Sequence, residues 1–233
     1  MIGIIGAMDI EVAALIERLE QPVQRTVSGL VFYSGSLCGR DAVVVRGGVG
    51  KVNAAMCAEA MLLCFRPKLV VNVGVAGAMT PGFQIGDIAL ARDLVQYDVD
   101  TTPLGDPIGM VSTVNRVDFP CAPWAVDAID AAARADGLRV KRIRIASGDR
   151  FNDSAEDKRL IVSRFGAEAS EMEGCPIAQV CWINGVDCAV IRAISDLTDG
   201  EHGAEYARYR DTAVESATRA LLAFLNSPAA AGL

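Results

Sequence analysis

Hydrophobic residues along this chain form two kinds of segment that alternate from one end to the other. Short continuous runs rich in Val and Ile predict buried strands at 2–5, 31–37, 42–46, 69–73, 87–91, 140–146 and 187–194. Longer segments with a helical repeat predict helices at 10–19, 52–64, 123–136, 155–164, 175–183 and 204–225. Because strands that alternate with helices are typical of crossover connections, the pattern predicts an α/β fold. We expect a mixed, mostly parallel central β-sheet flanked by helices.

The organisation of the chain predicts one domain over residues 1–233. A chain of 233 residues can bury one large core, and no linker, repeat or long low-complexity tract divides it. The stretch 98–119 is dense in Pro, Gly, Asp and Thr and has no hydrophobic period. It is too long for a simple connection, so we expect a binding or interface loop there.

Two glycine-rich turns follow predicted strands. The sequence GGVGK at 47–51 lacks the Ser or Thr that a P-loop needs at Val52, and it lacks the third glycine of a dinucleotide-binding motif at Asn53. A tight turn between a strand and a helix explains it equally well. The second turn, GVAG at 74–77, ends a buried strand, where ligands of α/β sheets commonly bind. This position favours a site without identifying its ligand.

Acidic residues just beyond apolar runs are the best candidates for chemistry. Glu11 follows the first predicted strand and Asp196 ends the last one, although helix N-terminal and N-cap roles explain each of them as well. Glu171 and Glu173 flank Met172, and alternate residues of an extended segment face opposite ways. Spacing alone does not choose between these two glutamates. The residues by themselves predict a carboxylate-lined pocket above the sheet.

Composition excludes several classes of function. The chain is 52% hydrophobic with a mean hydropathy of +0.30, but no apolar run approaches the roughly 20 residues of a membrane-spanning helix. Residues 1–12 lack a basic segment and include Asp9, unlike a signal peptide. We therefore expect a cytoplasmic protein without membrane contact. The net charge of −7 disfavours nucleic acid as a partner, because that affinity depends on clustered Lys and Arg.

Cysteine and histidine usage narrows the chemistry further. The seven cysteines are odd in number, lie mostly in apolar segments and never form a C-x-x-C motif, so buried reduced thiols are expected. The single histidine, His202, leaves no His-rich metal site, and a Ser-His-Asp triad would have to use it. We expect carboxylates to carry the chemistry, with no metal or cofactor.

Six sequence blocks carry a resemblance to a known family. They are IGIIGAMDIE at 2–11, GVGKV at 48–52, NVGVAG at 72–77, SGDRF at 147–151, EME at 171–173 and RAISD at 192–196. With these blocks in this order, the sequence resembles the methylthioadenosine/S-adenosylhomocysteine nucleosidases of the purine nucleoside phosphorylase superfamily. The resemblance spans nearly the whole chain and implies a nucleoside phosphorylase-like fold.

The resemblance implies hydrolysis of the N-glycosidic bond of methylthioadenosine, S-adenosylhomocysteine or both, with 5′-deoxyadenosine and futalosine-type nucleosides left open. Glu11 matches the carboxylate that activates water, and Asp196 matches the acid that protonates adenine N7. An acid at N7 lets adenine leave as a neutral molecule from an oxocarbenium-like state. This requires Asp196 to be protonated near neutral pH, which burial could arrange. Glu11 would act from the opposite face of the sugar.

The resemblance also implies a set of binding residues and a small-molecule adenine nucleoside as the partner. Glu173 matches the residue that binds the ribose 2′ and 3′ hydroxyls, Met172 the one that packs on the sugar, and Phe151 the aromatic that stacks on the base. The remaining matches are the backbone of Asn152 at the base edge; Ala76, Gly77, Arg192 and Ser195 around the pocket; and Met8, Val49 and Tyr206 toward the 5′ substituent. A homodimer is implied, with the loop near Leu104 reaching the neighbour's site.

The chain departs from the family pattern at several positions. Val75 stands where relatives often have Ser, and Asn152 replaces a usual apolar residue. In the long loop, Thr101, Leu104, Asp106 and Ser112 stand where some relatives carry Val, Phe, Tyr and Pro. These changes leave the size and polarity of the 5′ subsite open.

Three other functions compete with this reading. A phosphorylase of the same fold would need anion donors, but NVGV at 72–75 lacks the guanidinium and hydroxyl of the R-V-G-S pattern, and Glu11 would repel phosphate. A nucleoside-binding protein without turnover would not need a water-activating carboxylate and an N7 acid together. A nicotinamide-dependent oxidoreductase rests only on the incomplete glycine motif. The hydrolase is the favoured prediction.

Overall fold

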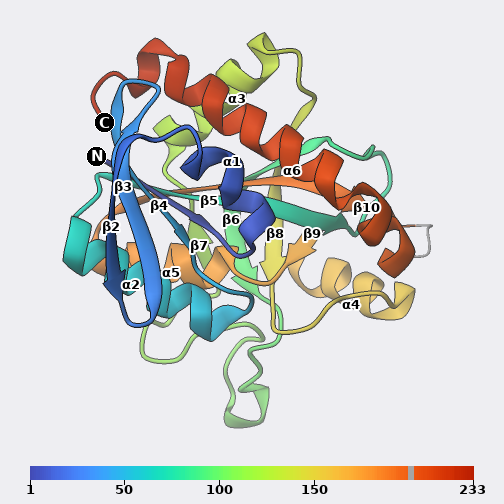
Figure 1. Cartoon of the computed structure of the whole chain (residues 1–233). Helices are drawn as coiled ribbons and strands as arrows, with labels where there is room; N and C mark the ends of the chain where they lie inside the picture. The colour runs from blue at the N-terminus through green and yellow to red at the C-terminus, as the bar shows by residue number, and fades with distance from the viewer. Residues whose placement is uncertain (199–201) are drawn as a thin grey trace.

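In the computed structural model of the chain, which describes residues 1–198 and 202–233, ten strands form one mixed sheet (Figure 1). Long apolar segments supply its centre, because strands covered on both faces must be apolar throughout. The described strands are β1 (Ile2–Gly6), β2 (Glu20–Val27), β3 (Leu30–Leu37), β4 (Arg40–Arg46), β5 (Leu69–Ala78), β6 (Ile88–Gln96), β7 (Asp118–Pro120), β8 (Val140–Ser147), β9 (Ala169–Glu171) and β10 (Asp187–Asp196).

Helices cover both faces of this sheet. In Figure 1, α3 and α6 lie above the sheet and α2 and α5 lie below it, while α1 lies in front of the central strands and contacts α6. The described helices are α1 (Asp9–Ile16), α2 (Lys51–Phe65), α3 (Pro123–Ala135), α4 (Ala155–Phe165), α5 (Gly174–Asn184) and α6 (His202–Asn226). The predicted α/β class with a mixed sheet is therefore confirmed. No helix in the described residues is long and apolar enough to cross a membrane.

Strand pairing closes part of the sheet on itself. β5 pairs in parallel with β10, β10 pairs antiparallel with β6, and β6 pairs in parallel with β8. β8 pairs in parallel with β9, which returns antiparallel to β5. From β5 the sheet continues through β1, β4, β3 and β2. β5 thus belongs both to the ring and to the open part of the sheet, so its carboxyl end lies at the junction of the two.

The sequence pattern missed three strands. β2 is exposed along almost its whole length, so it has no apolar face for a period-2 pattern to reveal. β7 and β9 have three residues each and β7 ends in Pro120, so neither carries a recognisable pattern. These strands form because the neighbouring strands already offer unpaired backbone groups, which is information that a local pattern does not contain.

An irregularity in β10 determines where its last residue lies. Arg192 is opposite Gly74 on β5, but a register shift after Ile194 brings Asp196 opposite Gly77. An extra residue at such a bulge turns the following side chain toward the other face of the strand. Arg192 and Asp196, four residues apart, are thereby directed to different sides of β5.

Local signals define α4, which packs beside the ring. Ser154 caps its start by accepting a hydrogen bond from the Asp157 backbone at 3.3 Å, and Gly166 ends it in the left-handed conformation at a φ of 64°. Lys158, Ile161 and Phe165 are the buried residues of the helix. A lysine therefore shares the inward face with two large apolar side chains.

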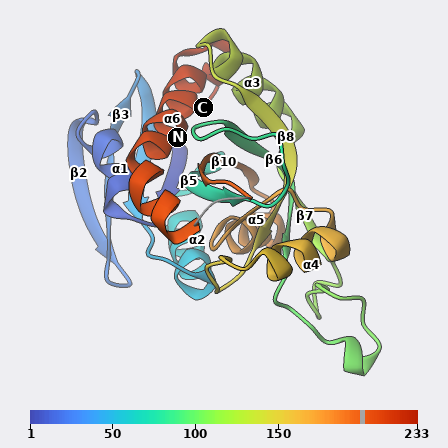
Figure 2. The same ribbon diagram turned by 90° about the vertical axis from the view of Figure 1, so that its right-hand side faces the viewer.

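The segment between β6 and β7 projects from the body of the molecule (Figure 2). It contains a short 3-10 helix, Thr102–Leu104, and Leu104 is 83% exposed. This is the long loop that the sequence predicts as a binding or interface segment. His202 begins α6, and its side chain lies outside the described part of the structure.

Candidate active site

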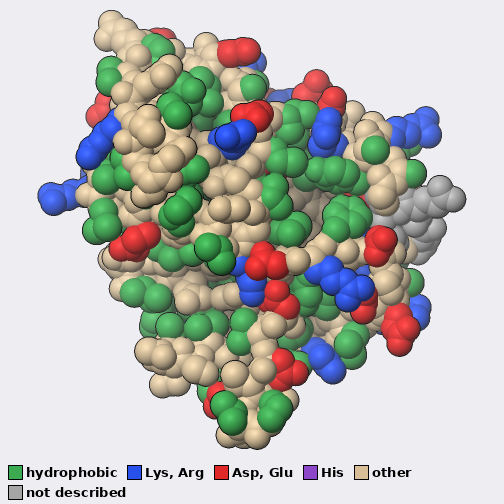
Figure 3. Space-filling view, turned by 60° about the horizontal axis from the view of Figure 1, so that its bottom comes forward, with side chains coloured by type: hydrophobic (Ala, Val, Ile, Leu, Met, Phe, Trp, Pro, Cys, Tyr) green, Lys and Arg blue, Asp and Glu red, His purple; other side chains and the backbone are tan. Residues whose placement is uncertain are grey.

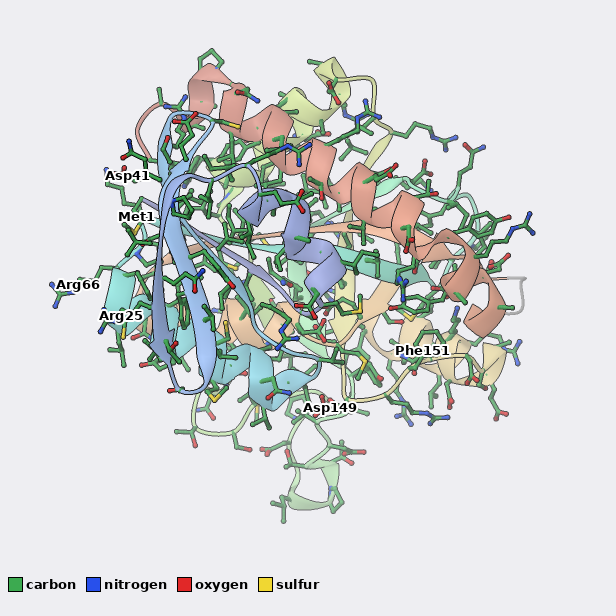
Figure 4. The ribbon with its side chains drawn as sticks, viewed as in Figure 1. Met1, Arg25, Asp41, Arg66, Asp149 and Phe151 are labelled. Atoms are coloured by element: carbon green, nitrogen blue, oxygen red, sulfur yellow. The ribbon has the colours of Figure 1, made fainter. Side chains whose placement is uncertain are left out.

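One pocket lies over the carboxyl ends of β5 and β10, beside the segment that joins β8 to α4. Figure 4 labels Asp149 and Phe151 on that segment. The pocket has a volume of about 620 Å³ counted out to its open mouth, within the usual range for small-molecule sites. Twelve of the fourteen residues predicted for the site line it: Met8, Glu11, Val49, Ala76, Gly77, Phe151, Asn152, Met172, Glu173, Ser195, Asp196 and Tyr206.

The Glu11 carboxylate is fixed at the floor of this pocket by backbone donors. Its Oε2 accepts hydrogen bonds from the N–H groups of Ala7 at 2.7 Å and Met8 at 2.9 Å, and its Oε1 accepts one from Val75 at 3.3 Å. Glu11 is only 3% exposed. Burial raises its pKa above the ordinary value, although the Arg192 charge and these N–H groups act in the opposite direction. A buried, immobile carboxylate of this kind is suited to taking a proton.

Two glycines allow carboxylates to approach β5 closely. A Cβ atom at Gly74 would lie 2.1 Å from Arg192 Nη1 and 2.4 Å from Glu11 Oε1, and one at Gly77 would lie 2.6 Å from Asp196 Oδ2. Any side chain at either position would occupy space that these charged groups fill. The glycines of the NVGVAG block thus serve the placement of acidic side chains.

Gly74→Ala should therefore destabilise the protein, because the new methyl group displaces Arg192 or Glu11. We expect the melting temperature to fall by about 3–10 °C, the effect of a typical overpacked core position. Thermal unfolding measures it, with Gly232→Ala as the control, since a Cβ at Gly232 meets nothing within 4 Å. Equal melting temperatures for the two variants would contradict the tight fit.

Arg192 lies behind the pocket and holds its acidic groups together. The side chain is 1% exposed, and its Nη2 donates to Asn72 Oδ1 at 2.6 Å. The same nitrogen contacts a carboxylate oxygen of Glu171 and lies 3.4 Å from Glu173 Oε2. Asn72 donates in turn to the Ile5 carbonyl oxygen at 2.8 Å. The guanidinium thereby links β10 to β5 and β1.

The two glutamates of the EME block have different environments. Glu171 accepts hydrogen bonds from the backbone of Glu173 at 2.9 Å and of Gly174 at 2.6 Å, and also from the Ser147 hydroxyl. Glu173 accepts one from the Gly50 backbone at 2.9 Å. Burial raises the pKa of Glu173 to about 7, with Arg192 acting in the opposite direction. Both glutamates line the pocket, but Glu171 is the one engaged at the start of α5.

Asp196 lies at the other end of the pocket floor and is 2% exposed. Its Oδ1 accepts a hydrogen bond from Ser195 Oγ at 2.9 Å, and its Oδ2 lies 3.4 Å from Lys158 Nζ. Lys158 also donates to the Ala78 carbonyl oxygen at 3.1 Å. The candidate acid is therefore in contact with a cation from α4.

Aromatic and apolar groups form the wall that faces these carboxylates. The rings of Phe151 and Tyr206 meet edge to face with their centres 5.7 Å apart, and the Tyr206 hydroxyl lies 3.4 Å from Met8 Sδ. Phe151 is 45% exposed, whereas Asn152 is buried with its Oδ1 3.4 Å from the Tyr97 hydroxyl. An apolar wall opposite a charged floor suits a flat base attached to a hydroxylated sugar.

Two predicted residues lie away from the pocket, and several neighbours were not predicted. Arg192 acts from behind the floor, and Leu104 lies on the projecting loop. Lys158 is not among the predicted residues, although its place on the apolar stripe of α4 is a readable signal in the sequence. Residues at the pocket that were not assigned a role are Ala7, Val75, Arg150, Ser170 and Glu171. No group of His, Cys, Asp and Glu with metal-binding geometry occurs among the described residues.

Comparison with known proteins places this site in a family. A sequence profile of the Phosphorylase superfamily matches residues 1–226. The chain belongs to this superfamily. Within the superfamily, a 5′-methylthioadenosine/S-adenosylhomocysteine nucleosidase from Geobacillus kaustophilus is 36% identical over 225 residues, which cover 96% of each chain. The resemblance stated from the sequence blocks is thereby confirmed.

Solved structures of the superfamily agree over the whole fold. The nucleosidase from Neisseria meningitidis, in complex with methylthio-immucillin-A, superposes with a TM-score of 0.92 at 30% identity and covers 97% of this chain and 98% of its own. The futalosine hydrolase of Helicobacter pylori strain 26695 gives the same TM-score and identity, with 97% of each chain covered. This superfamily member is thus similar to hydrolases that are named for different nucleosides.

Proposed function

We propose that this chain hydrolyses the N-glycosidic bond of 5′-methylthioadenosine and S-adenosylhomocysteine, releasing adenine. The observation that carries the proposal is the placement of Glu11 and Asp196, two buried carboxylates on one pocket floor, each packed against a glycine of β5. The homologous nucleosidases support the choice of substrates.

In the proposed reaction the two carboxylates have separate tasks. Glu11, held by three backbone N–H groups, takes a proton from the attacking water, and its raised pKa makes it a stronger base once it is ionised. Asp196 gives a proton to adenine N7, so the base leaves as a neutral molecule. Glu173 binds the ribose hydroxyls, Met172 packs on the sugar, and Phe151 stacks on the base.

Binding should weaken as the pH falls below about 7. Ionised Glu173 accepts hydrogen bonds from the ribose hydroxyls, and its protonated form has one acceptor fewer. Because its pKa is about 7, the protonated fraction grows as the pH falls through that value, and affinity should drop by up to about tenfold per pH unit. Calorimetric titration of adenosine between pH 5 and 8 measures this dependence.

Glu173→Gln tests the assignment of this pH dependence. The variant should bind adenosine weakly and without the step near pH 7, whereas Glu215→Gln on the exposed face of α6 should behave as the wild type. An affinity that keeps the same pH dependence in Glu173→Gln would transfer the titration to another group.

A phosphorylase is the nearest competing activity on this fold. Where a phosphate would have to bind, the floor presents the buried Glu11 carboxylate, and Val75 supplies no hydroxyl. Like charges in such a site repel strongly. Hydrolysis therefore fits the floor better than phosphorolysis.

Release of adenine from methylthioadenosine, measured with and without phosphate, tests the proposal. We expect free methylthioribose at a rate that does not depend on phosphate. Strict dependence on phosphate with a sugar 1-phosphate as the product would make the protein a phosphorylase. If no adenine appears in either buffer, methylthioadenosine is not a substrate, and S-adenosylhomocysteine, 5′-deoxyadenosine and a futalosine-type nucleoside serve as the next panel.

We also propose a homodimer in the cytoplasm. Figure 3 shows hydrophobic side chains on the side of the molecule that includes the projecting loop. Large apolar residues exposed on α2, α5 and this loop are Val52, Met56, Leu63, Leu104, Trp182 and Ile183. A surface of this kind is typical of subunit contacts.

The seven cysteines are free thiols, as suits a reducing compartment. The mass in solution tests the dimer.

A further inference from the structure

Lys158 is a buried cation that has no role in the reaction proposed above. Its side chain is 3% exposed and that of Asp196 is 4% exposed. An ammonium group removed from water needs close polar partners, because desolvation of an unpaired charge is very costly. Lys158 Nζ has such partners in the Ala78 carbonyl oxygen at 3.1 Å and Asp196 Oδ2 at 3.4 Å. The pair is buried: Asp196 lines the pocket, and Lys158 contacts it from behind.

The environment of Lys158 favours an easily transferred proton. Burial lowers its pKa below the ordinary value, while Asp196, Glu205 and Asp153 act in the opposite direction. These carboxylates come from β10, from α6 and from the segment before α4. Lysines, unlike arginines, can lose a proton in such surroundings. Lys158 does not line the pocket, so any effect on a substrate passes through Asp196.

A cation in this place changes the expected state of Asp196. Burial alone would favour the protonated carboxyl, whereas an adjacent ammonium favours the carboxylate. Asp196 alone then does not account for the proton that adenine N7 receives. Lys158 and Asp196 therefore have to be considered together as the source of the proton for N7.

We propose that Lys158 is a positioning residue that stores the proton which Asp196 delivers to the leaving base. The inference rests on the proposed hydrolysis, since only a reaction that protonates the base needs this supply. Asp196 lies between Lys158 and the pocket, so it relays the proton rather than storing it.

Protons and electrons balance in the proposed step. Lys158 passes a proton to Asp196 Oδ2, and Asp196 passes a proton to N7 while the electron pair of the C1′–N9 bond moves into the purine ring. The water oxygen bonds to C1′, and Glu11 takes a proton from that water. The enzyme is left with a neutral Lys158 amine, an Asp196 carboxylate and a Glu11 carboxylic acid. Exchange with solvent moves one proton from Glu11 back to Lys158.

Two substitutions separate storage of a proton from a structural role. Lys158→Arg keeps the charge but removes the transferable proton, because guanidinium does not deprotonate in proteins. At every pH from 5 to 9, its kcat for methylthioadenosine should be roughly 100-fold below that of the wild type, with KM changed less than about threefold. In Lys158→Met the lysine ammonium no longer favours the ionised form of Asp196, so Asp196 itself carries the proton at acid pH and the variant should remain active there. It should lose activity at a lower pH than the wild type, because the lysine no longer stores a proton.

Lys141 provides matched controls, because its Nζ also donates to a carbonyl oxygen, that of Gly82 at 2.7 Å, but this contact is exposed, whereas the contacts of Lys158 are buried. Lys141→Arg and Lys141→Met should both keep the wild-type pH profile. If Lys158→Arg works as fast as the wild type, or Lys158→Met keeps the wild-type profile, Lys158 is structural and the proposal is wrong.

The resting state is measured without turnover by carbon-13 NMR of protein labelled at the aspartate carboxyl carbons, with Asp196→Asn identifying the Asp196 signal. We expect this signal at its ionised position at pH 7 in the wild type, and a titration at higher pH in Lys158→Met. An Asp196 that is protonated at pH 7 in the wild type would overturn the proposal. Because this readout needs no substrate, its failure is distinct from failure of the adenine-release assay.

Discussion

Glu11→Gln should lower kcat for methylthioadenosine by about 10³-fold, within the range expected for loss of a general base. A glutamine at this position cannot take a proton from water. The backbone N–H groups of Ala7, Met8 and Val75 now donate to the carboxylate. The amide nitrogen of glutamine would face one of these donors and could not accept from it. Steady-state kinetics at pH 7 and single-turnover adenine release measure the effect.

Glu17→Gln is the matched control for this substitution, since Glu17 follows the same helix but is exposed. It should keep wild-type kinetics. Circular dichroism and thermal unfolding establish that the Glu11 variant is folded. A folded Glu11→Gln with normal turnover would remove Glu11 from the mechanism.

Asp196→Asn should lower kcat for methylthioadenosine by a similar factor of about 10³, while KM changes little. Asparagine keeps the size of the side chain and can still accept from Ser195 Oγ, but it has no proton to give to N7. Asp187→Asn, at the exposed start of the same strand, should leave the kinetics unchanged.

The leaving group distinguishes loss of the acid from a general disturbance of the pocket. A p-nitrophenyl 5-methylthioriboside releases a stable anion and needs no protonation. Asp196→Asn should hydrolyse it almost as fast as the wild type, whereas Glu11→Gln should remain slow with both substrates. Equal losses for Asp196→Asn on both substrates would argue against its role as the acid.

The sequence was most informative where several signals coincided. Glu11 and Asp196 each end or follow an apolar run, and parallel strands bring such ends to one edge of a sheet, so a shared pocket could be expected. Their separate roles could not be read from position, because N-cap and helix N-terminal functions explain the same placement. The family blocks supplied those roles as predictions.

Long-range contacts were the part that the sequence could not supply. β2 has no buried face, and its existence depends on the exposed edge of β3. The contact between Lys158 and Asp196 joins residues 38 positions apart and depends on how α4 packs beside the ring. The bulge in β10 that turns Asp196 toward Gly77 leaves no mark in RAISD. Each of these features follows from tertiary packing rather than from a local period.

The positions of the two glycines on β5 set the distance between the two carboxylates. Gly74 and Gly77 are an odd number of residues apart, so they face opposite sides of an extended strand, and three residues of strand span about 10 Å. Glu11 packs against the first glycine and Asp196 against the second. The spacing of the two carboxylates is therefore set by the backbone of one strand rather than by adjustable rotamers. If Glu11 and Asp196 act as proposed, we expect the site to accept different 5′ substituents more readily than a change in the distance between sugar and base.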